Sequence, residues 1–129
     1  AFVAYCRAPF MKKLLERELR DTAAETGQPV SAQIQDLEPI ISEIRLHGIS
    51  RASGSLTPGI NGFSAPVFDH TGHMVAAITS LGAIGHFDTE WNSPLAVAIK
   101  EAAQALSLRL GHSETAAPPP GTVLASIAR

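Results

Sequence analysis

The alternation of apolar and polar residues breaks down in the segment 59–82, which reads GINGFSAPVFDHTGHMVAAITSLG. It holds two apolar runs, each long enough for a strand, separated by the turn-forming residues DHTG. Side chains of a strand point to opposite faces of a sheet with period two, so a ribbon with one face in water should alternate apolar and polar residues. These runs barely alternate. We therefore expect a β-hairpin whose two faces both need cover.

Pairing of the two runs across a tight turn assigns their residues to faces. One face then holds Gly62, Ser64, Pro66, Phe68, Val75, Ala77, Thr79 and Leu81. The other face holds Asn61, Phe63, Ala65, Val67, Met74, Ala76 and Ile78. A glycine bulge in the turn would shift the register by one residue and exchange the faces of the second strand, so both registers stay open.

Helical spacing of apolar residues marks two segments before the hairpin. Residues 9–26 predict an amphipathic helix that Gly27 stops. A second helix is expected to take Asp36 as its N-cap, because Pro39 has no amide hydrogen and is tolerated only in the first turn. Gly48 supplies its C-terminal stop.

A short edge strand at 49–52 precedes the hairpin, and one clear helix follows it. Ser93 is a good N-cap for this helix, Pro94 suits its first position, and Gly111 closes it. Its expected apolar stripe is Leu95, Ile99, Ala102, Leu106 and Leu110. Beyond it the proline run predicts a flexible tail over 113–129. The fold class expected for residues 1–112 is α+β, a sandwich with a mainly antiparallel sheet covered by helices.

Composition narrows the function classes. The chain has 129 residues, of which 45% are hydrophobic and 17% are charged, which is typical of one globular domain. A net charge of −2 gives no basic surface for nucleic acid. No apolar run is long enough to cross a bilayer, so we expect a cytoplasmic protein without membrane contact. The single cysteine, Cys6, is interpreted as packing, and the start at Ala1 without methionine predicts a fragment.

The search for catalytic motifs is mostly negative. The sequence has no G-x-S-x-G, phosphate-binding loop, G-x-G-x-x-G or H-E-x-x-H pattern, and we expect no catalysis and no cofactor. Asp69, His70 and His73 could hold a metal, but polar residues at a hairpin tip are usually solvated, so no metal is predicted. The alternative to a binding domain is a small enzyme that uses His86 and Asp88 on a ligand held by the hairpin.

Thr79 and Gly62 are the candidate ligand contacts that the strand pattern itself provides. Thr79 is the one hydroxyl on its strand face in the second run, so a buried face would leave it in need of a partner from the backbone or from a ligand. Gly62 lies inside a strand, where glycine often marks a bulge or the close approach of another group. We expect the two residues to face each other, with the glycine leaving empty volume.

The run TPGINGFSAPVFDHTGHMVAAITSLGAIGHF, together with IISEIRLHGIS, AFVAY and ALSLRLG, resembles the effector-binding domain of IclR-type transcriptional regulators. The resemblance covers most of residues 1–112. It implies a GAF-like fold, a small-molecule effector, a homodimer or higher oligomer, and operator DNA bound only through an N-terminal winged helix-turn-helix that this chain lacks. It also implies that the first strands of the sensor domain are missing, which would leave a sheet edge open.

The family's pocket positions fall in this sequence on Ala52, Gly62, Thr79 and Leu81. Three of these four are not polar, whereas members that bind very small organic acids tend to place acidic, thiol or hydroxyl groups there. Ser53 or Ser55 is expected to supply the polar group in their place. This departure argues against the very small acids. The empty volume expected at Gly62, with Thr79 as the only nearby strand hydroxyl, predicts an effector with an apolar body, an aromatic or medium-chain organic acid, rather than a two- or three-carbon acid.

Overall fold

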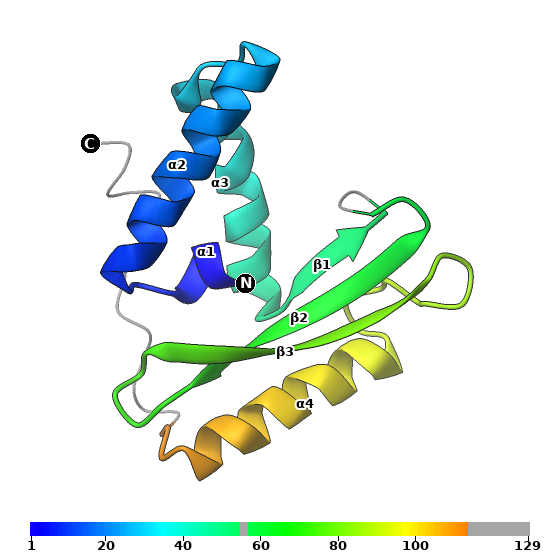
Figure 1. Ribbon diagram of the computed structural model, residues 1–129. Helices are drawn as coiled ribbons and strands as arrows, with labels where there is room; N and C mark the ends of the chain where they lie inside the picture. Colours follow the sequence, from blue (N-terminus) through cyan, green and yellow to red (C-terminus); the bar gives the residue numbers. More distant parts are fainter. Residues whose placement is uncertain (55–56, 114–129) are drawn as a thin grey trace.

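A computed structural model describes residues 1–54 and 57–113, and these ranges contain four helices and a three-stranded antiparallel sheet (Figure 1). The elements in chain order are α1 (Phe2–Tyr5), α2 (Pro9–Thr26), α3 (Val30–His47), β1 (Ser50–Ser53), β2 (Ile60–Phe68), β3 (Met74–Ala83) and α4 (Pro94–Arg109). The strand order is β1-β2-β3, so β2 is central. The expected α+β class is confirmed, and most of the predicted tail lies outside the described residues.

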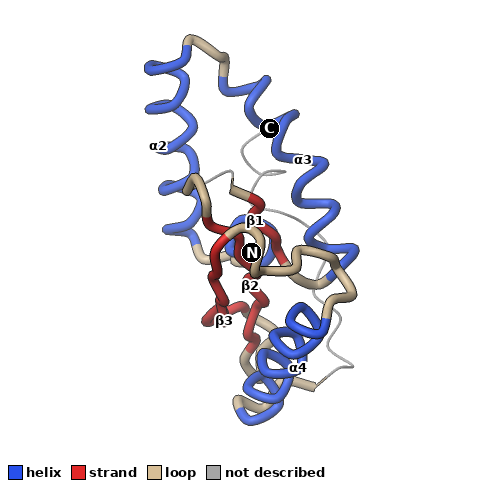
Figure 2. The backbone as a smooth tube through the Cα atoms, turned by 90° about the vertical axis from the view of Figure 1, so that its right-hand side faces the viewer, coloured by secondary structure: helices blue, strands red, loops and turns tan. Residues whose placement is uncertain are grey.

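Helices lie on both sides of the sheet. In Figure 1, α4 runs beneath the sheet, while α1, α2 and α3 lie on the other side. Figure 2 shows α2 and α3 rising together away from the strands as a helical pair. Of this group, the short α1 contacts β3, and α3 contacts β1. Part of the sheet face opposite α4 is therefore left without a helical cover.

The α4 side of the sheet carries the main core. Its buried residues are Ile49, Phe63, Ala65, Val67, Phe87, Ala96, Ile99 and Ala103. The predicted start of α4 is confirmed, because the Ser93 hydroxyl accepts a hydrogen bond from the Ala96 amide at 3.2 Å and Pro94 is the first helical residue.

The apolar stripe predicted for α4 is partly wrong. Ile99 is buried as expected, but the other buried residues of the helix are Ala96, Ala103 and Ser107. The predicted Ala102, Leu106 and Leu110 are exposed. Small side chains at 96, 103 and 107 allow the helix axis to approach β2 closely, and this close packing turns the larger leucines outward.

The predicted start of the second helix is also wrong. Helix α3 begins at Val30, six residues before the proposed cap Asp36, and it contains Pro39 in its interior. Proline removes the amide that would bond to the carbonyl of Gln35, but both residues are exposed, so water can satisfy that carbonyl. The additional N-terminal turns of α3 are held by Gln33, whose buried side-chain amide donates to the backbone carbonyls of Leu19 at 3.1 Å and Gln28 at 3.0 Å.

The other helical predictions are confirmed. Helix α2 spans Pro9–Thr26 and ends at Gly27, and α3 ends at Gly48; both glycines have the positive φ of a left-handed cap, 72° and 69°. Cys6 is a buried free thiol. Next to it, Tyr5 donates to the carbonyl of Ile44 at 3.2 Å, and burial raises the pKa of this phenol.

The hairpin register agrees with the predicted faces. Gly62 pairs with Leu81, Ser64 with Thr79 and Pro66 with Ala77. A bulge does occur, between Val67 and Phe68, close to the tip of the hairpin. It pairs Phe68 with Met74, which were predicted on opposite faces, and leaves the predicted faces of the other pairs unchanged. The first strand is Ser50–Ser53, one residue later than predicted.

Candidate functional site

A shallow pocket lies on the sheet face opposite α4, and we call it the sheet pocket. It encloses a volume of about 260 Å³. Its lining comes from the N-terminal residue and all three strands: Ala1, Ser50, Arg51, Ala52, Gly62, Phe63, Ser64, Thr79 and Leu81. The structure thus brings together four of the five predicted site residues. Ser53 does not line the pocket, and Ser55 lies outside the described residues.

Two hydroxyl groups meet on the floor of the sheet pocket. Ser64 and Thr79 pair across β2 and β3, and their oxygens lie 2.9 Å apart in a hydrogen bond. The expectation that Thr79 is the only nearby strand hydroxyl is therefore wrong, although the sequence pattern already placed Ser64 on that face. One hydroxyl hydrogen is used within the pair, so one O–H donor and several lone pairs remain for a ligand in this exposed position.

The volume above Gly62 is not empty, which corrects a second expectation. Gly62 pairs with Leu81 rather than with Thr79. A Cβ atom built on Gly62 would lie 2.6 Å from Leu81 Cδ2 and 3.2 Å from the carbonyl oxygen of Ser80. The leucine side chain therefore lies across the glycine, in the space that a Cβ atom would need. That side chain is 68% exposed, so it is free to turn away when another apolar group takes its place.

The guanidinium of Arg51 is engaged outside the sheet pocket, although the residue is part of the lining. Its Nη1 donates to the carbonyl of Thr89 at 3.1 Å, and its Nη2 lies 3.6 Å from Glu43. The guanidinium carbon also lies 4.2 Å from the centre of the Trp91 ring, on which His47 stacks at 4.2 Å. The side chains that do face the pocket therefore offer hydroxyls and apolar carbon rather than a free charge.

His86 and Asp88 do not line the sheet pocket. Both are exposed on the connection after β3, and Asp88 Oδ1 accepts a hydrogen bond from the amide of Glu90 at 2.9 Å, as in a local turn. The pair therefore lies in an exposed connecting segment, apart from the residues that line the sheet pocket.

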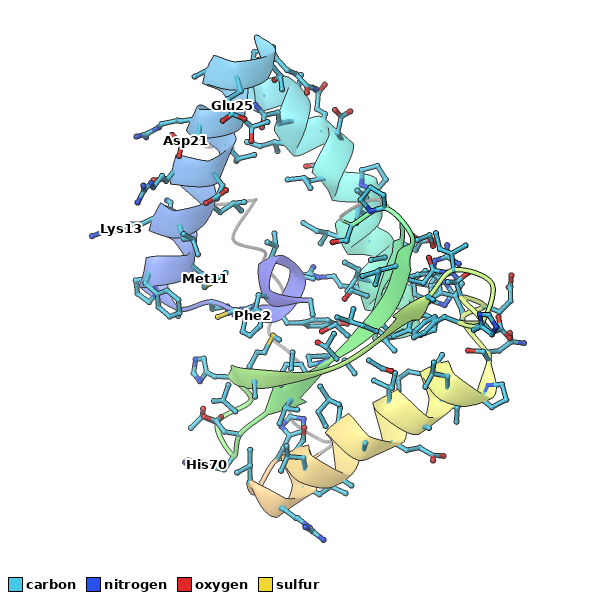
Figure 3. All side chains as sticks on the ribbon, turned by 45° about the vertical axis from the view of Figure 1, so that its right-hand side comes forward. Phe2, Met11, Lys13, Asp21, Glu25 and His70 are labelled. Atoms are coloured by element: carbon cyan, nitrogen blue, oxygen red, sulfur yellow. The ribbon has the colours of Figure 1, made fainter. Side chains whose placement is uncertain are left out.

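The hairpin tip uses its polar groups to hold the turn. Asp69 Oδ1 accepts hydrogen bonds from the Thr71 amide at 2.8 Å, the Thr71 hydroxyl and the His73 amide at 3.2 Å. The Thr71 hydroxyl is the main cause that holds the pKa of Asp69 below its usual value. His70 lies at the tip beside the end of α4 (Figure 3).

Two wider searches of the described chain are negative. In residues 1–54 and 57–113, no group of three or more His, Cys, Asp or Glu side chains is arranged to hold a metal ion. None of the helices in the same ranges combines the length and apolarity needed to span a membrane.

Comparison with known proteins gives a family and a set of similar structures. The family model described as "Bacterial transcriptional regulator IclR C-terminal" matches residues 1–108. The crystal structure of Pseudomonas aeruginosa HmgR is similar with a TM-score of 0.71 and 29% identity, and the match covers 88% of this chain and 42% of that chain. Comparison with curated protein sequences gives no match.

Two further solved structures are similar over a shorter region. Thermotoga maritima IclR matches with a TM-score of 0.56 and 28% identity, over 60% of this chain and 32% of that chain. The Agrobacterium tumefaciens repressor BlcR matches with a TM-score of 0.56 and 26% identity, over the same shares of 60% and 32%. This chain therefore spans less than half the length of each of these three structures.

Proposed function

Because the chain belongs to the IclR family of bacterial transcriptional regulators, as its C-terminal domain, we propose that it is the small-molecule-sensing part of such a regulator. The observation that carries this proposal is the sheet pocket. In this pocket the hydroxyl pair Ser64–Thr79 lies near Gly62, which the exposed side chain of Leu81 covers. The pocket lies on the sheet face that has little helical cover. A ligand that displaces Leu81 would replace exposed apolar surface with a buried contact, which favours binding.

The chemistry of the lining favours an effector with an apolar body and few polar atoms. Ala52, Gly62 and Leu81 offer only carbon or backbone, and the Ser64–Thr79 pair offers one O–H donor. An aromatic or medium-chain organic acid fits this lining, with its apolar part in place of the Leu81 side chain and its carboxylate at the hydroxyl pair. A two- or three-carbon acid would leave most of the volume of about 260 Å³ unfilled.

A metabolite screen by thermal unfolding tests this proposal. An effector at about 100 times its dissociation constant should stabilise the fold by about 2.7 kcal/mol, enough to raise Tm by several degrees. Thr79→Val removes a hydroxyl with little change of shape and should reduce the shift. Thr22→Val, the same change at an exposed position of α2, is the matched control. A screen in which only the smallest acids raise Tm contradicts the size argument, and a Thr79→Val protein with an unchanged response removes Thr79 from the site.

We further propose that the chain self-associates and has no catalytic role. Val75, Leu81 and Ile84, on and next to β3, are each at least half exposed, and a homodimer is the simplest closed arrangement that covers such apolar surface. Operator DNA would be contacted by another part of the regulator, because the net charge of −2 gives this chain no basic surface. Specific retardation of operator DNA by this chain alone in a gel-shift assay would contradict the proposal that another part of the regulator contacts the DNA.

A further inference from the structure

A second pocket lies on the other side of β2, where the strand passes α4. It has a volume of about 220 Å³ and shares no lining residue with the sheet pocket. We call it the β2–α4 pocket. The lining residues that matter here are Ala65, Pro66, Phe68, Lys100, Ala103 and His112.

The part of β2 that forms the pocket wall is an open sheet edge, but it has no amide hydrogen without a hydrogen-bond acceptor. β1 begins at Ser50, opposite Ser64, so the rest of β2 has no β1 partner. Pro66 has no amide hydrogen, and the amide of Phe68 donates to Ser107 Oγ at 3.0 Å. The Ser107 hydroxyl in turn donates to the carbonyl of Ala103 at 2.8 Å. The amide of Phe68 is thus satisfied internally and Pro66 has none, and what faces the pocket is mainly carbon.

Two nitrogen-bearing side chains stand beside this apolar wall. Lys100 is half-buried and forms no ion pair with any residue in the described ranges. Its sequence neighbour Glu101 points to another side of the helix, because adjacent residues do not face each other. His112 Nδ1 lies 3.2 Å from the carbonyl oxygen of Asp69. Since a carbonyl only accepts, Nδ1 carries a hydrogen, and Nε2 of the neutral ring is an acceptor that a carboxylate cannot use, which leaves Lys100 as the partner for an anion.

An apolar wall beside a lysine that has no anionic partner among residues 1–54 and 57–113 is complementary to a carboxylate on a compact apolar body. An apolar cavity of about 150 Å³ is large enough to bind benzene. The larger β2–α4 pocket therefore has room for an aromatic ring together with a carboxylate.

We propose that the β2–α4 pocket is a second ligand site, which binds a small aromatic monocarboxylate. The ring packs against Pro66, Phe68 and Ala103, and the carboxylate lies at Lys100. This site is distinct from the sheet pocket, because the two pockets share no lining residue. Ligand bound there would bridge α4 and the end of β2, two elements otherwise joined at this point by the Ser107 hydrogen bonds.

Amide NMR titration of the 129-residue chain with benzoate tests the proposal. Saturable shifts are expected at the amides of Ala103, Gln104 and His112. Lys100→Met keeps the length of the side chain but removes the charge, and should weaken benzoate binding about tenfold. Lys13→Met is the matched control, since Lys13 is exposed on α2 and points away from the rest of the chain (Figure 3). Benzamide, which has no charge, should bind the wild-type protein about as weakly as benzoate binds Lys100→Met.

Three results would overturn the second site. They are the absence of saturable shifts on α4, shifts confined to Gly62 and Thr79, and equal benzoate affinity of Lys100→Met and wild type. The second of these results would place benzoate in the sheet pocket, and so would leave the proposed sensing function standing while removing the second site.

Discussion

Ser107 makes the most quantitative prediction, because one hydroxyl joins α4 to the end of β2. The residue is 3% exposed, accepts the Phe68 amide at 3.0 Å and donates to the Ala103 carbonyl at 2.8 Å. Ser107→Ala leaves the Phe68 amide without an acceptor, which costs about 1–3 kcal/mol. Alanine has a higher helix propensity than serine, which offsets about 0.5 kcal/mol of the lost stability. The expected net loss is about 0.5–2.5 kcal/mol, or about 2–10 °C in Tm for a domain of this size.

Thermal and urea unfolding followed by circular dichroism measure this loss. Ser42→Ala is the matched control, because Ser42 is an exposed residue inside α3 where the same change should stabilise slightly. Faster hydrogen exchange of the Phe68 amide in Ser107→Ala would locate the effect. A Ser107→Ala protein whose stability lies within about 0.5 kcal/mol of wild type would refute the account of how α4 is attached, since surface changes commonly have effects of that size.

Three further predictions follow from single features of the fold. Ser93→Ala removes the N-cap of α4 and should cost about 1 kcal/mol in denaturant unfolding; an unchanged midpoint would show that the cap is not needed. Thr71→Val should raise the pKa of Asp69, measured by NMR titration of its carboxyl carbon, because the Thr71 hydroxyl holds that pKa down. A carboxyl whose pKa is lowered by folding stabilises the protein at pH values above its unfolded pKa, and this stabilisation is lost as the pH falls through the folded pKa. The difference in stability between wild type and Thr71→Val should therefore vanish in strong acid. Equal titration curves of Asp69 in the two proteins would contradict the role given to the Thr71 hydroxyl. Static light scattering should give a dimer mass at micromolar concentration, and a monomer mass would count against the proposed self-association.

The features that could be predicted from the sequence are those set by local chemistry. Gly27 and Gly48 end helices because their left-handed conformation suits glycine, and Ser93 with Pro94 begins one because both fit a helix start. The hairpin faces follow from the period of two in each strand, and the bulge after Val67 disturbs only the pair Phe68–Met74 because it lies beyond the other paired residues.

The features that could not be predicted depend on contacts between distant segments. Pro39 is tolerated inside α3 because Gln33 and neighbouring apolar residues bind that helix to α2, and no rule about proline alone contains this contact. The buried stripe of α4 is chosen by how closely the helix approaches β2, which favours alanine and serine over leucine.

In the candidate site, too, the features set by local sequence were predictable and those set by contacts between distant segments were not. Its face was predictable from the strand pattern, but its partners were not, because they depend on the register across the hairpin. Register decides that Ser64 lies opposite Thr79 and that Leu81 lies opposite Gly62. The hydroxyl pair and the leucine over the glycine both follow from that one fact.

Hydrogen–deuterium exchange, measured with and without the first metabolite that raises Tm, tests the central claim most directly. If the sheet pocket senses the effector, ligand should slow exchange in β1, in the first half of β2 and in the second half of β3, the segments that carry Ala52, Gly62 and Thr79. Slowed exchange confined to α4 or to the α2–α3 pair, with these three strand segments unchanged, would contradict it.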